Sequence, residues 1–104
     1  ETIADFLSEA VERRIFKPAQ IEAIQSRITG VVGTENVSPD TDLVIEAVFE
    51  DFDIKTAVFT TLDEVCDENT ILASNTSSLS VNELAAATGR PDKFVGLHFF
   101  YHPA

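Results

Sequence analysis

The chain has 104 residues, a hydrophobic fraction of 44% and a formal net charge of −11, with 18 acidic against seven basic side chains. That length fits one domain at most, which would bury roughly two-thirds of its unfolded surface. The negative charge argues against nucleic-acid binding, and no apolar run approaches the ~20 residues of a membrane span. The single Cys66 excludes an intrachain disulfide and a multi-cysteine zinc site. We therefore expect a cytoplasmic protein that binds neither nucleic acid nor membrane.

Two helical patterns open the chain. Apolar residues recur at three- and four-residue spacing over residues 2–14, with Thr2 as the predicted N-cap. Pro18 suits the first position of a second helix, which runs to about residue 26 and is expected to bury Ile21 and Ile24. Residues 2–26 are therefore predicted to form a helical hairpin.

A glycine-containing segment separates the hairpin from the rest of the chain. Residues 28–32 predict a short strand. The stretch from Gly30 to Gly33 is not a phosphate-binding loop, because its spacing differs from Gly-x-Gly-x-x-Gly and it opens no helix. A polar loop follows as far as residue 42.

Three strand patterns and two helical patterns alternate from residue 43 onward. The strands are expected at residues 43–48, 71–74 and 94–100, and the first, apolar and β-branched, is typical of a strand buried on both faces. The helices are expected at residues 51–65 and 81–88, the second opening with Ser80 and Glu83 as a capping box. This alternation predicts an α/β fold with parallel strands and right-handed crossovers.

Polar side chains follow each of these strands. Ligands of open α/β sheets bind beyond the carboxyl ends of the strands, so these residues are candidates for a site: Glu46, Glu50, Ser74, Asn75, Thr76, Ser77, Ser78 and His98. Each also has a structural interpretation. His98 could be a satisfied core residue, the serine-rich segment a turn with a helix cap, and Glu50 a partner of a helix dipole. Lys55 could be a solvated surface charge, and Cys66 a small apolar core residue.

Three segments, in this order and spacing, resemble the NAD-binding domain of L-3-hydroxyacyl-CoA dehydrogenases. They are Asp42-Leu43-Val44-Ile45-Glu46-Ala47-Val48, Ala73-Ser74-Asn75-Thr76-Ser77-Ser78-Leu79 and Gly96-Leu97-His98-Phe99-Phe100. The predicted hairpin matches a helical excursion before the third strand of that family. The resemblance implies a partial Rossmann-like sheet of about four strands with flanking helices. Residues 1–104 would then be a single incomplete NAD-binding domain, with the sheet and its crossover helices over about 27–100.

The resemblance also implies roles for individual residues. His98 matches the catalytic histidine, which takes the proton of the substrate 3-hydroxyl while a hydride leaves C3. Ser77 matches the serine that hydrogen-bonds the substrate oxygen beside the cofactor, and Asn75 is expected to contact substrate. Glu50 and Lys55 match positions that contact NAD. An imidazole suits this chemistry because it can exchange a proton near neutral pH.

The implied function is NAD-dependent oxidation of (S)-3-hydroxyacyl-CoA to 3-oxoacyl-CoA, as in fatty-acid β-oxidation or butanoate metabolism. We expect NAD as cofactor, no metal, an acyl-CoA substrate and a homodimer. The family's glycine-rich loop would precede Glu1 and its histidine-orienting glutamate would follow Ala104, so the chain is expected to be an inactive internal fragment. Tyr101-His102 replaces the family's Asn-Pro, and His102 is interpreted as a loop residue.

Two alternative functions stay open at this point. One is a non-catalytic α/β interaction module that keeps the sheet but has lost the site. The other is an NAD-linked dehydrogenase of a β-hydroxy acid without CoA, although the helical catalytic lysine typical of such enzymes is not found.

Overall fold

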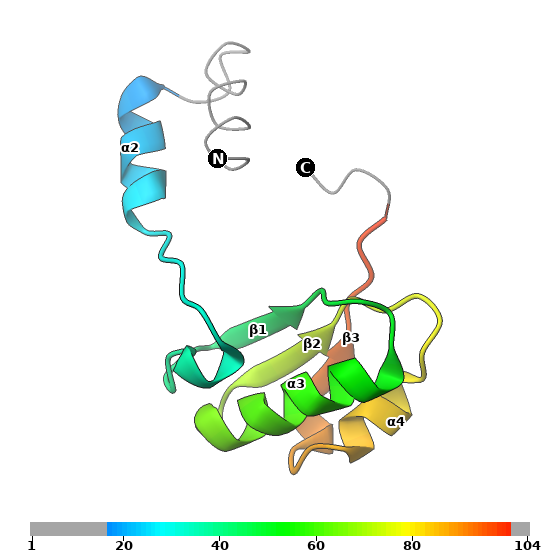
Figure 1. The fold of residues 1–104 in the computed structure, drawn as a ribbon. Helices are drawn as coiled ribbons and strands as arrows, with labels where there is room; N and C mark the ends of the chain where they lie inside the picture. Colours follow the sequence, from blue (N-terminus) through cyan, green and yellow to red (C-terminus); the bar gives the residue numbers. More distant parts are fainter. Residues whose placement is uncertain (1–16, 101–104) are drawn as a thin grey trace. The chain divides into compact units, whose positions relative to one another are not determined.

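The computed structural model describes residues 17–100, and the chain divides into two compact units with their boundary between Gly30 and Val31. In the described residues, the first unit contains helix α2 (Pro18–Ser26), and the second contains a sheet with its crossover helices (Figure 1). The predicted helix over residues 2–14, its Thr2 cap, and Tyr101 and His102 lie outside the described residues. The complete hairpin and the single incomplete domain stay predictions.

Helix α2 begins where the sequence predicts. Lys17 precedes it in an extended conformation, as expected for a residue before proline, and its N–H donates to the side chain of Gln20 at 2.7 Å. The expected burial of Ile21 and Ile24 is wrong, because both are only half-buried. An apolar stripe of two side chains is too short to form a core of its own.

The strand predicted at residues 28–32 is also wrong. These residues form no strand, and Val31 and Val32 keep 58% and 90% of their surface exposed. Gly33 follows with φ of +90°, a backbone conformation that glycine adopts readily, and leads into the 3-10 turn η1 (Thr34–Asn36). The β-branched pair is therefore bounded by two glycines and has no partner strand among the described residues.

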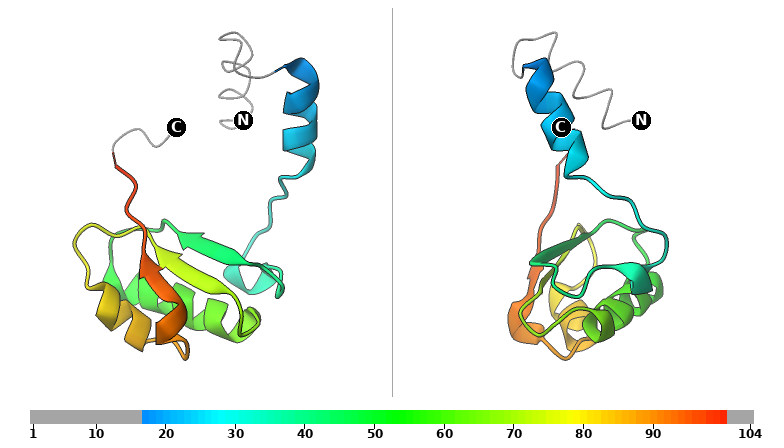
Figure 2. Two further views of the ribbon diagram at one scale, coloured as in Figure 1. Left: turned by 180° about the vertical axis from the view of Figure 1, so that it is seen from behind. Right: turned by 90° about the vertical axis from the view of Figure 1, so that its left-hand side faces the viewer.

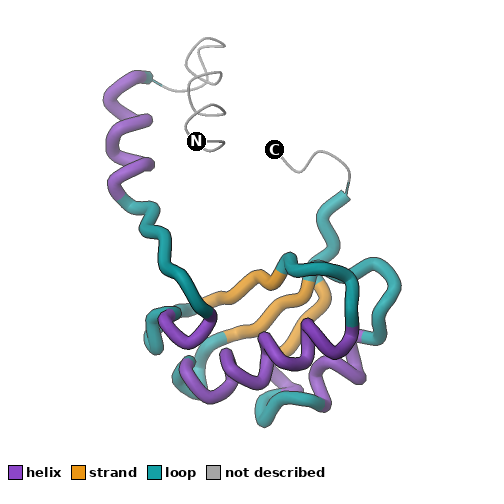
Figure 3. Tube along the Cα trace, viewed as in Figure 1, coloured by secondary structure: helices purple, strands orange, loops and turns teal. Residues whose placement is uncertain are grey.

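The second unit confirms the parallel α/β architecture, with three strands in place of the expected four or so. Strands β1 (Leu43–Glu46), β2 (Ile71–Ser74) and β3 (Phe94–Gly96) lie in the order β1-β2-β3, all parallel (Figure 3). Helix α3 (Phe52–Val65) connects the first two, and helix α4 (Val81–Ala86), followed by the 3-10 turn η2 (Pro91–Lys93), connects the second pair. Ser80 caps α4 as predicted, accepting a hydrogen bond from the Glu83 N–H at 3.2 Å.

Both crossover helices lie on one face of the sheet, where the core forms. Seen from behind in Figure 2, the strands lie in front and α3 and α4 lie behind them. The core comprises Phe59, Leu62, Cys66 and Leu72, and the Phe59 ring packs edge-on against Phe94 at 4.7 Å between centroids. The interpretation of Cys66 as a small apolar core residue is confirmed.

The opposite face of the sheet is apolar but exposed in the described chain. The strand register places five residues on it. Ala73 is buried, and the other four have 42–48% of their surface exposed: Leu43, Ile45, Ile71 and Val95. The expectation that the first strand is buried on both faces is therefore wrong for this chain. The continuous apolar run indicates two packing faces, but within this unit the two crossover helices cover only one.

Two strands and the second helix end earlier than predicted. β1 stops at Glu46, not residue 48, because the Val48 N–H donates to the Glu46 carboxylate at 2.7 Å and leaves the ladder. β3 stops at Gly96, not residue 100, and the Phe99 N–H donates to the Asn75 side chain at 3.1 Å. α4 ends at Ala86, not residue 88, with Ala87 as its C-cap.

Arg90 connects the end of α3 to the amino edge of the sheet. Its guanidinium donates five hydrogen bonds, one to the Asp63 carboxylate at 2.7 Å and the others to main-chain carbonyls of Asp63, Cys66, Asp67 and Thr70. Burial raises the pKa of Asp63, but hydrogen bonds from the Gly89 N–H and Arg90, together with the Arg90 charge, hold that pKa below its usual value. Arg90 itself is 8% exposed. The position is structural, and the sequence did not indicate it.

Candidate active site

The carboxyl ends of the three strands lie at one edge of the sheet and carry the polar residues that the sequence singled out. Glu46 pairs with Ser74 in the register, and Ser74 pairs with Gly96, so the strands end level. Gly96 allows close packing there, because a Cβ atom at this position would lie 2.9 Å from Cγ2 of Val81 on α4 and the Val81 side chain would have to shift. The strand ends are therefore close enough for the loops that follow them to interact.

A buried ion pair lies beneath this edge. The Lys55 ammonium, on the second turn of α3, is 2.5 Å from the Glu46 carboxylate, and both side chains are almost completely buried. The other oxygen of Glu46 accepts a hydrogen bond from the Ser74 hydroxyl at 2.5 Å. The interpretation of Lys55 as a solvated surface charge is therefore wrong. A charged residue inside an apolar strand is costly unless it is paired, and α3 supplies the partner.

Glu50 lies above this pair and holds the loop that follows β2. One carboxylate oxygen accepts four hydrogen bonds at 2.6–3.0 Å, from the Thr76 hydroxyl, the N–H groups of Ser77 and Ser78, and the Ser78 hydroxyl. The other oxygen lies 3.5 Å from the Lys55 ammonium. The Thr76 hydroxyl chiefly, and then the Ser78 and Ser77 donors, lower the pKa of Glu50 to about 2 against the opposing effect of burial. Glu50 is therefore a fixed negative charge at neutral pH.

Ser77, Asn75 and His98 complete the edge. Ser77 is exposed, and its position is set through its own N–H by Glu50. Asn75 is half-buried and accepts the Phe99 N–H, so it holds the segment next to His98. His98 is exposed two residues beyond β3, and its ring lies 4.9 Å from that of Phe100. The interpretation of His98 as a core residue is therefore wrong.

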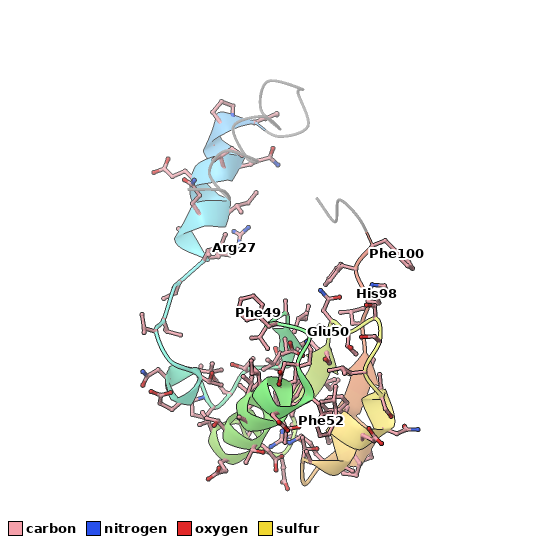
Figure 4. The ribbon with its side chains drawn as sticks, turned by 45° about the vertical axis from the view of Figure 1, so that its right-hand side comes forward. Arg27, Phe49, Glu50, Phe52, His98 and Phe100 are labelled. Atoms are coloured by element: carbon pink, nitrogen blue, oxygen red, sulfur yellow. The ribbon has the colours of Figure 1, made fainter. Side chains whose placement is uncertain are left out.

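The structure thus brings the predicted site residues to one edge of the sheet, where some are accessible and Lys55 is buried. Ser77, His98 and part of Glu50 are accessible, and Figure 4 shows Glu50 and His98 at this edge, with exposed Phe49 and Phe100 beside them. Lys55 has no exposed surface in the described chain, and its ammonium forms an ion pair with Glu46. The exposed groups offer a carboxylate, a hydroxyl and an imidazole, which are a hydrogen-bond acceptor, a donor and a base.

Comparison with known proteins decides the family. The family model described as the 3-hydroxyacyl-CoA dehydrogenase NAD binding domain matches residues 1–104. The chain belongs to this family. The family predicted from the three sequence segments is therefore confirmed.

Two relatives of this dehydrogenase-family chain are considerably longer than it is. The chain is 47% identical over 94 residues to a 3-hydroxybutyryl-CoA dehydrogenase of Clostridioides difficile, covering 90% of the chain and 33% of that protein. It is 43% identical over 96 residues to a fatty acid oxidation complex subunit alpha of Acinetobacter baumannii, covering 92% of the chain and 13% of that protein. The chain therefore spans a third or less of these two relatives.

A solved structure agrees with the fold of this family member. The crystal structure of 3-hydroxybutyryl-CoA dehydrogenase from Escherichia coli K12 matches with a TM-score of 0.89 and 37% identity, covering 99% of this chain and 21% of that one. The predicted Rossmann-type α/β class is confirmed. Separately, no helix within residues 17–100 combines the length and apolar character needed to cross a membrane.

The sequence did not predict the ion pair of Glu46 and Lys55 beneath the site. It placed Glu46 only among the polar residues that follow a strand, and it assigned Lys55 a contact with the cofactor by resemblance. One signal was present, since a glutamate within the apolar run Leu43-Val44-Ile45-Glu46-Ala47-Val48 requires a buried partner. No pattern in the sequence identifies the cation that supplies this partner.

Proposed function

We propose that the protein containing this chain is an oxidoreductase that transfers a hydride from an (S)-3-hydroxyacyl-CoA to NAD, giving the 3-oxoacyl-CoA. One observation carries the proposal: the family match over residues 1–104 coincides with the exposure of Ser77 and His98 at one sheet edge. The Clostridioides difficile and Acinetobacter baumannii relatives, named for 3-hydroxybutyryl-CoA dehydrogenase and fatty acid oxidation, support the acyl-CoA substrate class.

The polar and apolar side chains at this edge fit the nicotinamide half of NAD. The Glu50 carboxylate, 34% exposed in its side chain, can accept hydrogen bonds from ribose hydroxyls, and the Ser77 hydroxyl can reach a polar group of the same half. The exposed Phe49 and Phe100 provide apolar surface for a flat ring. When bound, NAD supplies the acceptor for the hydride. We propose that Lys55 supports this site through Glu50, because its ammonium is buried.

His98 is proposed as the catalytic base. Its imidazole accepts the proton of the substrate 3-hydroxyl as the C–H bond at C3 breaks and the C–O bond gains double-bond character. The products are the 3-oxoacyl thioester, the reduced cofactor and a proton on His98 that is later released to water. The Ser77 hydroxyl donates a hydrogen bond to the same substrate oxygen and stabilises its partial negative charge.

Substitutions in the full-length protein test these roles. Consumption of NADH with acetoacetyl-CoA should be readily measurable in the unsubstituted protein. His98→Gln should lower kcat by at least about a hundredfold, because a positioned base contributes about 10²–10⁴ in rate. Ser77→Ala should cost less, since one donor is lost and the base remains. The dissociation constant of NAD should change little in His98→Gln.

The second histidine of the chain provides the control. His102→Gln should keep kcat near that of the unsubstituted protein, as expected of a loop residue. A full-length protein without turnover would refute the proposed function. Near-normal kcat in His98→Gln, or a loss confined to His102→Gln, would refute the catalytic assignment instead.

The partners and location of the whole protein belong to the proposal as well. The homodimer expected from the family resemblance stays a prediction, and light scattering of the full-length protein measures it directly. The cytoplasmic location likewise stays a prediction. Localisation of a tagged full-length protein in its host would test it.

A further inference from the structure

The Ala47–Glu50 turn after β1 is held from below by both members of the buried ion pair. The Glu46 carboxylate accepts the Val48 N–H at 2.7 Å, while the Lys55 ammonium donates to the Val48 carbonyl at 3.3 Å. The two polar groups of Val48 are therefore fixed by opposite charges. This main-chain geometry brings the next residue but one, Glu50, over the edge of the sheet.

The same ion pair reaches both sides of the site. Lys55 lies 3.5 Å from Glu50, whose other oxygen holds the Thr76–Ser78 loop, and Glu46 holds the Ser74 hydroxyl at the end of β2. An unbroken series of contacts therefore runs from the buried pair through Glu50 to the N–H of Ser77. Each contact includes at least one charged group, and such hydrogen bonds are roughly twice as strong as neutral ones.

We propose that Glu46 and Lys55 are positioning residues, which fix the Ser77 hydroxyl by holding Glu50 over the sheet edge. The effect on catalysis rests on the proposed function, whereas the effect on the loop does not. Lys55 then influences the reaction through Glu50, whose carboxylate lies 3.5 Å from its ammonium. Loss of the pair should release Glu50 toward solvent and leave the Thr76–Ser78 loop without its acceptor.

A double variant of the full-length protein separates positioning from folding. Removing one charge alone would strand the other in the core, so Glu46→Gln and Lys55→Met are combined to replace the pair by neutral groups of similar size. Hydrogen exchange at the Ser77 and Ser78 amides should quicken by at least about tenfold, while the Leu72 amide in the core keeps its rate. The kcat should fall about 10- to 100-fold, as expected for a displaced catalytic group.

Thr70→Val is the matched control. Thr70 is as completely buried as Lys55 and donates to the Thr41 carbonyl at 2.5 Å, but it precedes β2 at the opposite edge of the sheet. This variant should leave kcat and the exchange of Ser77 and Ser78 unchanged.

The two readouts assign failure to different causes. Unchanged exchange at Ser77 and Ser78 in the double variant would overturn the positioning role. Faster exchange with an unchanged kcat would overturn its importance for catalysis. Absence of turnover in the unsubstituted protein would refute the proposed function, and the exchange rates would still decide whether the pair holds the loop.

Discussion

Replacing Arg90 by methionine should destabilise the sheet unit severely. The substitution keeps a side chain of similar length but removes all five N–H donors of the guanidinium. Two of their acceptors, the carbonyls of Cys66 and Thr70, belong to buried residues and take buried hydrogen bonds. The acceptors on Asp63 and Asp67 are nearer to solvent and can bind water instead.

The expected loss in the free energy of unfolding follows from the two buried carbonyls that would lack a hydrogen-bond donor. A buried acceptor without a partner costs about 1–3 kcal/mol, so two of them predict a loss of about 2–6 kcal/mol from the free energy of unfolding. That loss is a large part of the roughly 5–15 kcal/mol that stabilises a typical domain. Arg90→Lys should be intermediate, because an ammonium has three donors and cannot replace the planar set of five N–H donors of the guanidinium.

Native-state hydrogen exchange measures this loss in the full-length protein. The slowest amides of β2, such as that of Leu72, report the free energy of opening the unit. Arg27→Met provides the control, since Arg27 is an exposed arginine at the end of α2 and its loss should change stability by no more than about 0.5 kcal/mol. An Arg90→Met protein within about 1 kcal/mol of the parent would show that these hydrogen bonds do not stabilise the unit as argued.

Three smaller predictions follow from other contacts. Glu50 should titrate near pH 2 in an NMR measurement, and Thr76→Val should raise that pKa toward 4.5. Because folding lowers the pKa of Glu50, its contribution to the free energy of unfolding is present above pH 4.5 and is lost as the pH falls through about 2. A Glu50 pKa unchanged by Thr76→Val would contradict the assigned cause. Ser80→Ala should cost about 1 kcal/mol in the same exchange measurement, and a neutral result would refute the capping role. Asn75→Ala should quicken exchange of the Phe99 amide, whereas an unchanged rate would show that the Asn75 side chain does not hold this segment.

Local sequence patterns predicted the elements whose stabilising contacts are also local. Helix α3 has an apolar stripe and an N-cap at Asp51, and β2 lies between clear turn signals, so both were placed correctly. The strand ends were not, because they depend on side chains: Glu46 captures the Val48 N–H and Asn75 captures the Phe99 N–H. The false strand at residues 28–32 shows the converse, since its β-branched residues have no neighbouring strand in the described chain.

Residue types identified the members of the candidate site but not their burial. Ser77, Glu50 and His98 were expected at the sheet edge, and all three lie there. No pattern distinguished Lys55 from a surface lysine, because its partner is nine residues away on another element. Four of the five hydrogen bonds of the Arg90 guanidinium likewise go to main-chain carbonyls, which have no sequence signature.

The buried pair of Glu46 and Lys55 also restricts how the chain can fold. If β1 paired with β2 one residue out of step, Glu46 would turn to the apolar open face and Ile45 or Ala47 would take its place. The Lys55 ammonium would then lose its buried counter-ion and keep only the partly exposed Glu50, which is more costly than an apolar mismatch. The register in which Glu46 reaches Lys55 is therefore lower in energy than the misaligned ones. Whatever the pair adds to stability, it selects the one alignment in which the strands end level.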